Sequence, residues 1–323
     1  MNLRIDAYGH IGLPRFTSAE AFLALMDRHD VERTLLSTAQ YCPDLTELAR
    51  AVSLAPTRFQ ALGLPLGTDR KAVRHSIEAQ PQAGFCGIRI AAAVAQEDPE
   101  LLEIIGRHGK FALVVAFEPW SPYAPLLVDF LDRYPKSFVI GGHFAGPGDP
   151  LLLTRDAGMA RLFEHARFVV AFTRQGLFAP AVLDPWARAL VDCMGWNRIL
   201  WGSEWPVALW RDESYADTMR FVDRFNPTDA QRHCFFYQNA KDLVFGSTQA
   251  THIAAIAQYD LMPHRVPSDI HLFPGGLHLP EQLHQRLAMA YLQSPHRETM
   301  RYSGFVSELI DAGLRADAAT EDR

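Results

Sequence analysis

Short, strongly apolar runs recur along the first two hundred residues of this chain, and amphipathic segments separate them. The runs are continuous in apolar residues rather than alternating, which is typical of strands in a parallel sheet that is buried on both faces. Consecutive runs begin roughly 30 residues apart, the length of one strand–loop–helix–loop unit. We therefore expect eight strands, at Leu3–Asp6, Thr34–Ser37, Phe59–Leu64, Phe85–Ile90, Phe111–Phe117, Phe138–Gly142, Phe168–Phe172 and Ile199–Trp201.

The amphipathic segments between the runs carry helix start signals. Ser18 and Thr228 stand where N-cap residues belong, and Asp184-Pro185 predicts the start of another helix. Eight strand–helix units predict a (β/α)8 barrel, a TIM barrel, over residues 1–246. The alternative is an open doubly wound sheet, and the absence of a glycine-rich phosphate loop after the first run argues against it.

Residues 247–323 read differently, as a mostly helical C-terminal extension that begins with a proline-rich loop. Two helices are expected, at Pro280–Gln293 and Arg297–Leu314. Each carries an apolar stripe that fits a lid or a contact in a homodimer, although packing on its own barrel is an equal alternative. The stripes comprise Leu283, Leu287, Ala290 and Tyr291 in the first helix, and Phe305, Leu309 and Ile310 in the second.

Composition and charge indicate which classes of binding partner are not expected. The 31 basic and 37 acidic residues are interspersed, for a net charge of -6, so we expect no nucleic-acid partner. The apolar runs are too short to cross a bilayer, and the chain opens directly on a core strand, so neither a membrane partner nor a signal peptide is expected. Four cysteines without C-x-x-C spacing indicate reduced thiols in a cytoplasmic protein.

Polar residues follow nearly every expected strand, where a parallel barrel keeps its chemistry. Histidines, carboxylates and arginines gathered at one barrel mouth are more than packing requires, because buried polar groups must be paired or solvated. Taken singly, His10 and His143 fit core histidines, and Glu204 fits an N-cap or an ion-pair partner of Arg89 or Arg174. The strand-end residues are Asp6, Tyr8, His10, Thr38, Gln40, Arg89, Glu118, His143, Thr173, Arg174 and Glu204.

Five motifs resemble the amidohydrolase-related barrels, in the branch that contains sugar-lactone and pyrone-dicarboxylate lactonases. The most specific is Arg198-Ile-Leu-Trp-Gly-Ser-Glu-Trp-Pro206, which is similar to that family's strand 8. The others are the first-strand string Ile5–Gly12, Gly87-Ile-Arg-Ile90 on strand 4, Gly142-His-Phe-Ala-Gly-Pro147 on strand 6, and the closing segment Gln238–Gly246.

Three positions depart from the family's pattern. Tyr8 replaces the first histidine of a His-x-His pair, Glu204 replaces an aspartate, and Ala145 stands where glycine is usual. In metal-using members the strand 1 histidines and the strand 8 carboxylate hold a divalent ion. His10, His143 and Glu204 are therefore the candidate ligands of a single Zn²⁺. Other members of the branch work without metal, and the resemblance favours that scheme, with no cofactor.

The resemblance implies a hydrolase acting on a lactone, or a similar cyclic ester or amide, of a small carboxylated molecule. Glu204 is then the general base for water, His143 and His10 donate to the oxyanion, and Tyr8 donates a hydrogen bond or protonates the leaving alkoxide. Arg89, Arg174, Gln40, Glu118 and Trp205 are the expected substrate contacts. The alternatives are a non-oxidative decarboxylase, a cyclase or dehydratase of a specialised pathway, or a non-catalytic ligand-binding barrel.

Overall fold

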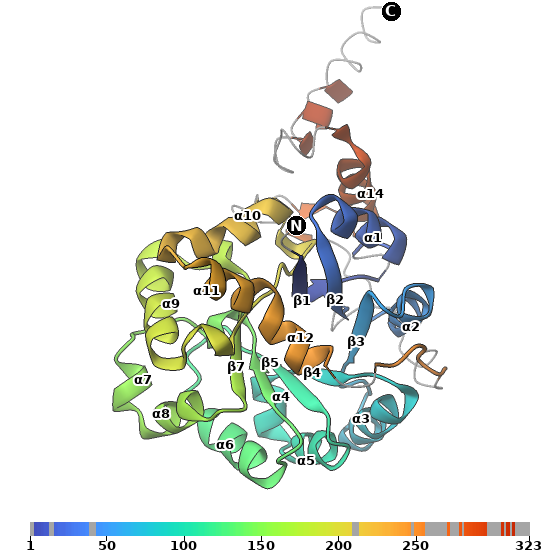
Figure 1. Ribbon diagram of the computed structural model, residues 1–323. Helices are drawn as coiled ribbons and strands as arrows, with labels where there is room; N and C mark the ends of the chain where they lie inside the picture. The colour runs from blue at the N-terminus through green and yellow to red at the C-terminus, as the bar shows by residue number, and fades with distance from the viewer. Residues whose placement is uncertain are drawn as a thin grey trace, which may run out of the picture.

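Eight parallel strands and their surrounding helices form a TIM barrel, as expected from the sequence. The computed structural model describes residues 3–12, 16–38, 43–208, 213–246 and 249–255, and shorter stretches between 270 and 313. The strands pair in chain order, with helices ringed around them (Figure 1). They are β1 Arg4–His10, β2 Val31–Ser37, β3 Phe59–Gly63, β4 Gly87–Ala91, β5 Phe111–Val115, β6 Val139–Gly141, β7 Phe168–Phe172 and β8 Ile199–Trp201.

The helices follow the strands as the periodicity predicts. Those of the barrel are α1 Ala19–Arg28, α2 Leu45–Leu54, α3 Arg70–Ala83, α4 Ala92–Glu97, α5 Glu100–Arg107, α6 Ala124–Arg133, α7 Leu152–Arg155, α8 Ala157–Glu164, α9 Pro180–Met194, α10 Tyr215–Arg220, α11 Asp229–His233 and α12 Asn239–Val244.

The N-cap prediction is confirmed at two helices. Ser18 caps α1 by accepting from the Ala21 amide, and Thr228 caps α11 in a capping box with Gln231. The helix start predicted at Asp184-Pro185 was wrong, because α9 begins at Pro180. A proline suits the first position of a helix, and an internal proline such as Pro185 removes one helical hydrogen bond without necessarily ending the helix.

Two apolar layers hold the barrel. One is formed by interior side chains such as Ile5, Leu62, Leu113 and Leu200. The other lies between strands and helices, where Phe22, Phe59 and Trp186 are fully buried.

The first strand is longer than predicted, since β1 continues to His10 and includes Tyr8. Gly9 sits against α1, where an added Cβ would come within 2.6 Å of the Phe22 ring. Close approach of β1 to α1 therefore requires glycine at this position.

One helix of the C-terminal extension packs on α1, whereas residues 249–255 contact β3 and the end of α3, at Gln60 and Ala83. Helix α14, Glu281–Gln293, lies beside α1 (Figure 1), and the Thr17 hydroxyl contacts the Met289 sulfur at 3.5 Å. Tyr291 is 1% exposed, whereas Leu283, Leu309 and Ile310 of the predicted stripes are exposed. Two short strands, β9 Ile270–His271 and β10 His278–Leu279, pair antiparallel. The second predicted helix falls largely outside the described residues.

The described residues can be compared with two expectations from composition: reduced cysteines, and apolar runs too short to cross a bilayer. Cys86, Cys193 and Cys234 are free thiols, and Cys42 lies outside the described residues. Across the part of the chain that the structure describes, no helix combines the length and apolarity that a bilayer crossing requires.

Candidate active site

Glu204 lies three residues beyond β8, at the carboxyl ends of the barrel strands. Its side chain is 1% exposed. Its amide donates to the Tyr8 carbonyl at 2.7 Å, and the His10 amide donates to the Trp205 carbonyl at 2.8 Å. These two bonds join the loop after β8 to β1 and so close the ring of strands. They also hold the Glu204 side chain over the mouth of the barrel.

Three cationic or potentially cationic side chains converge on the Glu204 carboxylate. Arg174 donates through Nε to both oxygens, each at 2.6 Å. The Nε2 atoms of His143 and His10 lie 3.6 and 3.9 Å from Oε1. Because strands 1, 6, 7 and 8 supply these groups, only the closed barrel brings them together.

The backbone turns sharply where three of these residues sit. His143, Arg174 and Glu204 have φ values of 54°, 62° and 52°, in the left-handed region that disfavours side chains with a Cβ. Each costs on the order of 1–3 kcal/mol and persists only where the surroundings enforce it. Ala145, at φ 51°, occupies a left-handed position where the resembling family has glycine. Such backbone strain is concentrated at functional sites.

His143 is fixed on two sides. Its Nδ1 is 2.8 Å from the Thr173 hydroxyl, which also accepts from the His143 amide at 2.9 Å. The Phe117 ring stacks on the imidazole at a centroid distance of 5.1 Å and an angle of 5°. The Arg174 guanidinium lies 4.8 Å from the same Phe117 ring. Phe117 therefore supports two of the groups around Glu204.

Tyr8 and Arg89 form a second pair in the barrel mouth. Arg89 Nε donates to the Tyr8 hydroxyl at 2.5 Å. Burial raises the pKa of Tyr8, and the Arg89 charge opposes that shift only in part, so the phenol keeps its proton. Since Arg89 fills an acceptor position, the phenol hydrogen is available for a different acceptor.

His10 is neutral at neutral pH. Burial lowers its pKa to about 4, although the nearby Glu204 carboxylate favours the charged form. Its ring packs against Tyr8 at 4.7 Å and stacks on Phe16 at 5.0 Å.

Asp6 ties β1 to the loop after β8. Its carboxylate accepts from the Ser203 amide at 2.9 Å, the Ser203 hydroxyl at 2.5 Å, the Tyr8 amide at 3.1 Å and the Tyr215 hydroxyl at 2.9 Å. Burial raises the pKa of Asp6, and these four donors oppose the shift. The carboxylate thus positions the residue before Glu204 and the backbone of Tyr8.

Glu118 and Trp205 were predicted to contact the substrate, but no described contact joins either side chain to Glu204. Glu118 is exposed and accepts from the Tyr123 hydroxyl at 2.5 Å. The Trp205 indole packs on Tyr215 at 5.7 Å. Gln40 lies outside the described residues.

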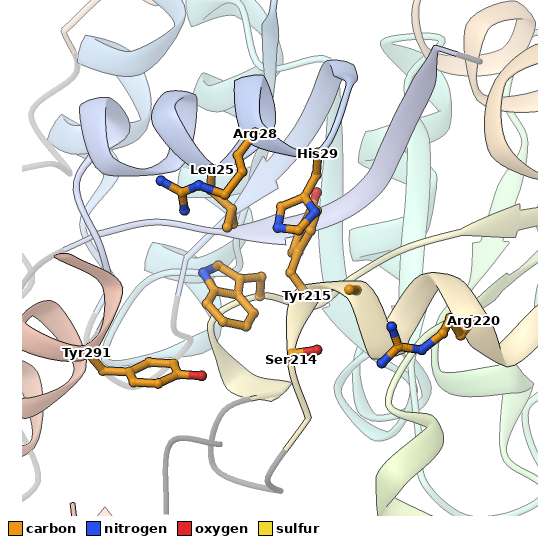
Figure 2. Close-up of a pocket in the computed structure, with 9 residues that line it drawn as sticks. Leu25, Arg28, His29, Ser214, Tyr215, Arg220 and Tyr291 are labelled. Atoms are coloured by element: carbon orange, nitrogen blue, oxygen red, sulfur yellow. The ribbon is translucent and has the colours of Figure 1, made fainter. Parts of the chain in front are cut away.

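Trp205 instead lines a cavity of about 420 Å³ between α1, α10 and α14. In Figure 2, Arg28 and His29 come from one side, Tyr215 and Arg220 from another and Tyr291 from a third. None of His10, His143, Arg174 or Glu204 lines it. This cavity is therefore separate from the candidate active site.

The side chains around Glu204 do not fit a divalent cation as they are arranged. Arg174 already places a positive charge on both carboxylate oxygens. Ligating histidines normally donate their other ring nitrogen to a partner, yet His10 Nδ1 has no hydrogen-bond partner among the described residues. Tyr8, in the place of a histidine ligand, is a protonated phenol. Within the described ranges, no cluster of three histidine, cysteine or acidic residues is arranged to hold a metal.

Sequence reasoning missed Phe117, Phe16 and the role of Thr173. Phe117 was expected within the fifth strand, but β5 ends at Val115, and Phe117 is 48% exposed beside His143. An aromatic residue directly after a barrel strand was the available signal for Phe117.

Comparisons with known proteins identify the family of this chain. The sequence matches the amidohydrolase family over residues 7–246. An L-fucono-1,5-lactonase from Burkholderia ambifaria is 31% identical over 97 residues, which are 27% of this chain and 32% of that protein. The chain thus aligns with about a third of the length of that relative.

Solved structures show the same fold. A Pseudomonas putida protein with a proposed 2-pyrone-4,6-dicarboxylic acid hydrolase activity matches 77% of this chain and all of its own, at 18% identity and a TM-score of 0.59. A dihydroxybenzoic acid decarboxylase from a Polaromonas species, with bound manganese, matches 76% of this chain and 97% of its own, at 16% identity and a TM-score of 0.57. The family match runs from within β1 to the end of the barrel and includes both Tyr8 and Glu204, and the chain therefore belongs to the amidohydrolase family.

Proposed function

We propose that this protein is a metal-independent hydrolase that opens a lactone, or a similar cyclic ester or amide, of a small carboxylated molecule. The observation that carries the proposal is the buried Glu204 carboxylate with His10, His143 and Arg174 directed at it. A fixed carboxylate beside imidazole donors suits water activation next to a developing oxyanion. The lactonase among the curated relatives supports the same class of substrate.

In the proposed reaction, Glu204 accepts a proton from water as the water oxygen attacks the acyl carbon. The tautomers of His143 and His10 with hydrogen on Nε2 donate to the carbonyl oxygen as it becomes negative. For His143, a Thr173 hydroxyl that donates to Nδ1 selects this tautomer. Donors of this kind contribute about 10²–10³-fold in rate.

Collapse of the tetrahedral intermediate breaks the acyl carbon–oxygen bond of the ring. Tyr8 donates its phenol proton to the leaving alkoxide, and Arg89 stabilises the phenolate that remains. The proton held by Glu204 then returns through solvent to Tyr8. The net change is the addition of one water to give a hydroxy acid.

The test is turnover of a lactone panel by the wild-type protein and by Glu204→Gln. The panel includes L-fucono-1,5-lactone and 2-pyrone-4,6-dicarboxylate, with Glu103→Gln as a control for loss of an exposed carboxylate. We expect Glu204→Gln to lower kcat by about 10²–10⁴-fold. Full turnover by Glu204→Gln would overturn the mechanism. Release of CO2 from 2,6-dihydroxybenzoate, without lactone turnover, would identify the decarboxylase alternative instead.

A further inference from the structure

The pairing of Arg174 with Glu204 poses a question for the proposed mechanism. A base that is ion-paired to an arginine gives up its charge reluctantly, because protonation would leave a guanidinium without its counter-charge. Both Glu204 oxygens accept a hydrogen bond from Arg174 Nε at 2.6 Å, so either oxygen must compete with Arg174 to accept a proton from water. Catalysis by Glu204 thus requires another anion to take over Arg174.

The geometry of the pair allows that exchange. Arginine usually binds a carboxylate through two parallel N–H bonds. Here the bonds to Glu204 both come from the single Nε. The pair therefore lacks the two parallel N–H bonds of the usual fork, and a carboxylate that makes them can compete with Glu204 for Arg174.

Exposure and packing place Arg174 on the approach to Glu204. The Arg174 side chain is 21% exposed, against 1% for Glu204, so an entering molecule meets the guanidinium before the carboxylate. Phe117, which is 48% exposed, offers its ring face to the guanidinium at 4.8 Å. A flat aromatic face retains a cation by a cation–π interaction while its ionic partner changes.

We propose that the Arg174–Glu204 ion pair is a latch that an anionic group of the substrate opens. The substrate's carboxylate binds the Arg174 guanidinium, Arg174 Nε leaves Glu204, and the freed carboxylate accepts the proton of water. This inference rests on the proposed function and deepens it. It makes Arg174 a specificity-determining residue that selects lactones bearing a negative charge.

The latch predicts a specific pattern of substrate preference. The probes are a carboxylated lactone that the wild-type protein hydrolyses and its primary carboxamide, which differ in charge but little in volume. For the wild type we expect kcat/KM to favour the acid by roughly 10- to 100-fold, the range for hydrogen bonds to charged groups. In Arg174→Met the acid should be hydrolysed more slowly and the carboxamide faster, because the base is uncovered. A simple clamp that never restrains Glu204 would leave the carboxamide rate unchanged.

Binding of citrate, a tricarboxylate that cannot be hydrolysed, supplies a test independent of turnover. Calorimetry is performed on the wild type, Glu204→Gln, Arg174→Met and the double variant, with Arg188→Met as a control for loss of an arginine that stacks on Phe225 outside the site. If the latch exists, Glu204→Gln binds citrate about tenfold or more tightly, and this gain disappears in the Arg174→Met background. A gain that persists there reflects charge repulsion alone and overturns the latch.

The failures of the two proposals are distinguishable. Full turnover by Glu204→Gln removes the proposed function. An inactive Glu204→Gln combined with equal wild-type rates on acid and carboxamide removes the latch and leaves the hydrolase intact. Melting temperatures of all variants check that each is folded.

Discussion

The Glu204 amide donates a hydrogen bond to the Tyr8 carbonyl at 2.7 Å. This bond joins two residues that depart from the family's sequence pattern, and each has an arginine partner: Arg89 on the Tyr8 hydroxyl and Arg174 on the Glu204 carboxylate. Tyr8 and Glu204 therefore form part of one rearranged site on neighbouring strands.

Removing the Tyr8 hydroxyl should impair turnover rather than folding. Tyr8→Phe takes away the proposed acid and leaves Arg89 Nε without this acceptor. We expect kcat to fall by about 10²-fold or more, the usual contribution of a general acid. Steady-state kinetics would measure the loss, with Tyr237→Phe as control, since that hydroxyl contacts Glu32 at 3.0 Å. Wild-type kcat in Tyr8→Phe would rule out a role for the phenol.

Asp6 should contribute to both stability and activity, because its carboxylate connects Ser203, Tyr8 and Tyr215. In Asp6→Asn, an amide NH2 group replaces one carboxylate oxygen, and this donor then faces groups that donated to that oxygen. Breaking a buried, charge-assisted network costs on the order of 3 kcal/mol. Urea unfolding would measure this loss, and kcat should fall with it. Asp69→Asn, which keeps a good N-cap on α3, is the matched control; equal stability of the two variants would contradict the assignment.

The ion pair between Arg74 and the buried Asp98 predicts part of the acid dependence of stability. Arg74 donates to both oxygens of Asp98, at 2.8 and 2.6 Å, and holds the pKa of Asp98 below its usual value. A lowered pKa gives stability that is complete above the unfolded-state pKa of about 3.9 and is lost as pH falls through the folded-state pKa. The unfolding free energies of wild type and Asp98→Asn should therefore differ at pH 6 and converge as pH falls below about 4. A difference that grows in acid would show the opposite sign.

Metal removal should leave the reaction intact. Because Arg174 supplies the positive charge beside Glu204, prolonged treatment with a chelator should not change kcat on the best lactone. Elemental analysis of the purified protein should find less than one equivalent of divalent metal. Stoichiometric zinc, with activity lost on chelation and restored by zinc, would contradict the metal-independent mechanism.

Tyr291 anchors helix α14 through a buried contact inside the C-terminal extension. Its side chain is 1% exposed and packs on Phe305 at 5.5 Å. Tyr291→Ala should lower the free energy of unfolding by about 3 kcal/mol, as for other buried aromatic truncations. Leu283→Ala, at an exposed position of the same helix, should change it by less than about 1 kcal/mol. Light scattering of both variants would show whether the predicted homodimer exists and whether it depends on α14.

The barrel itself is readable from the sequence. All eight strands lie at the predicted runs, because a strand buried on both faces must be apolar throughout. The caps at Ser18 and Thr228 are local signals, satisfied within one turn of helix. The positions of His10, His143 and Glu204 near strand ends follow from the same count, and with them the expectation of a shared site.

Pairing between side chains far apart in the chain was decided only by the tertiary structure. Nothing local indicates that Arg89 bonds Tyr8, that Asp6 bonds Ser203, or that Phe117 lies against both His143 and Arg174. Strand sequences specify which residues reach the barrel mouth, because apolar burial fixes their register. Which partner each polar group then takes depends on the closed ring and on backbone turns at His143, Arg174 and Glu204, whose left-handed conformations only the surrounding packing can enforce.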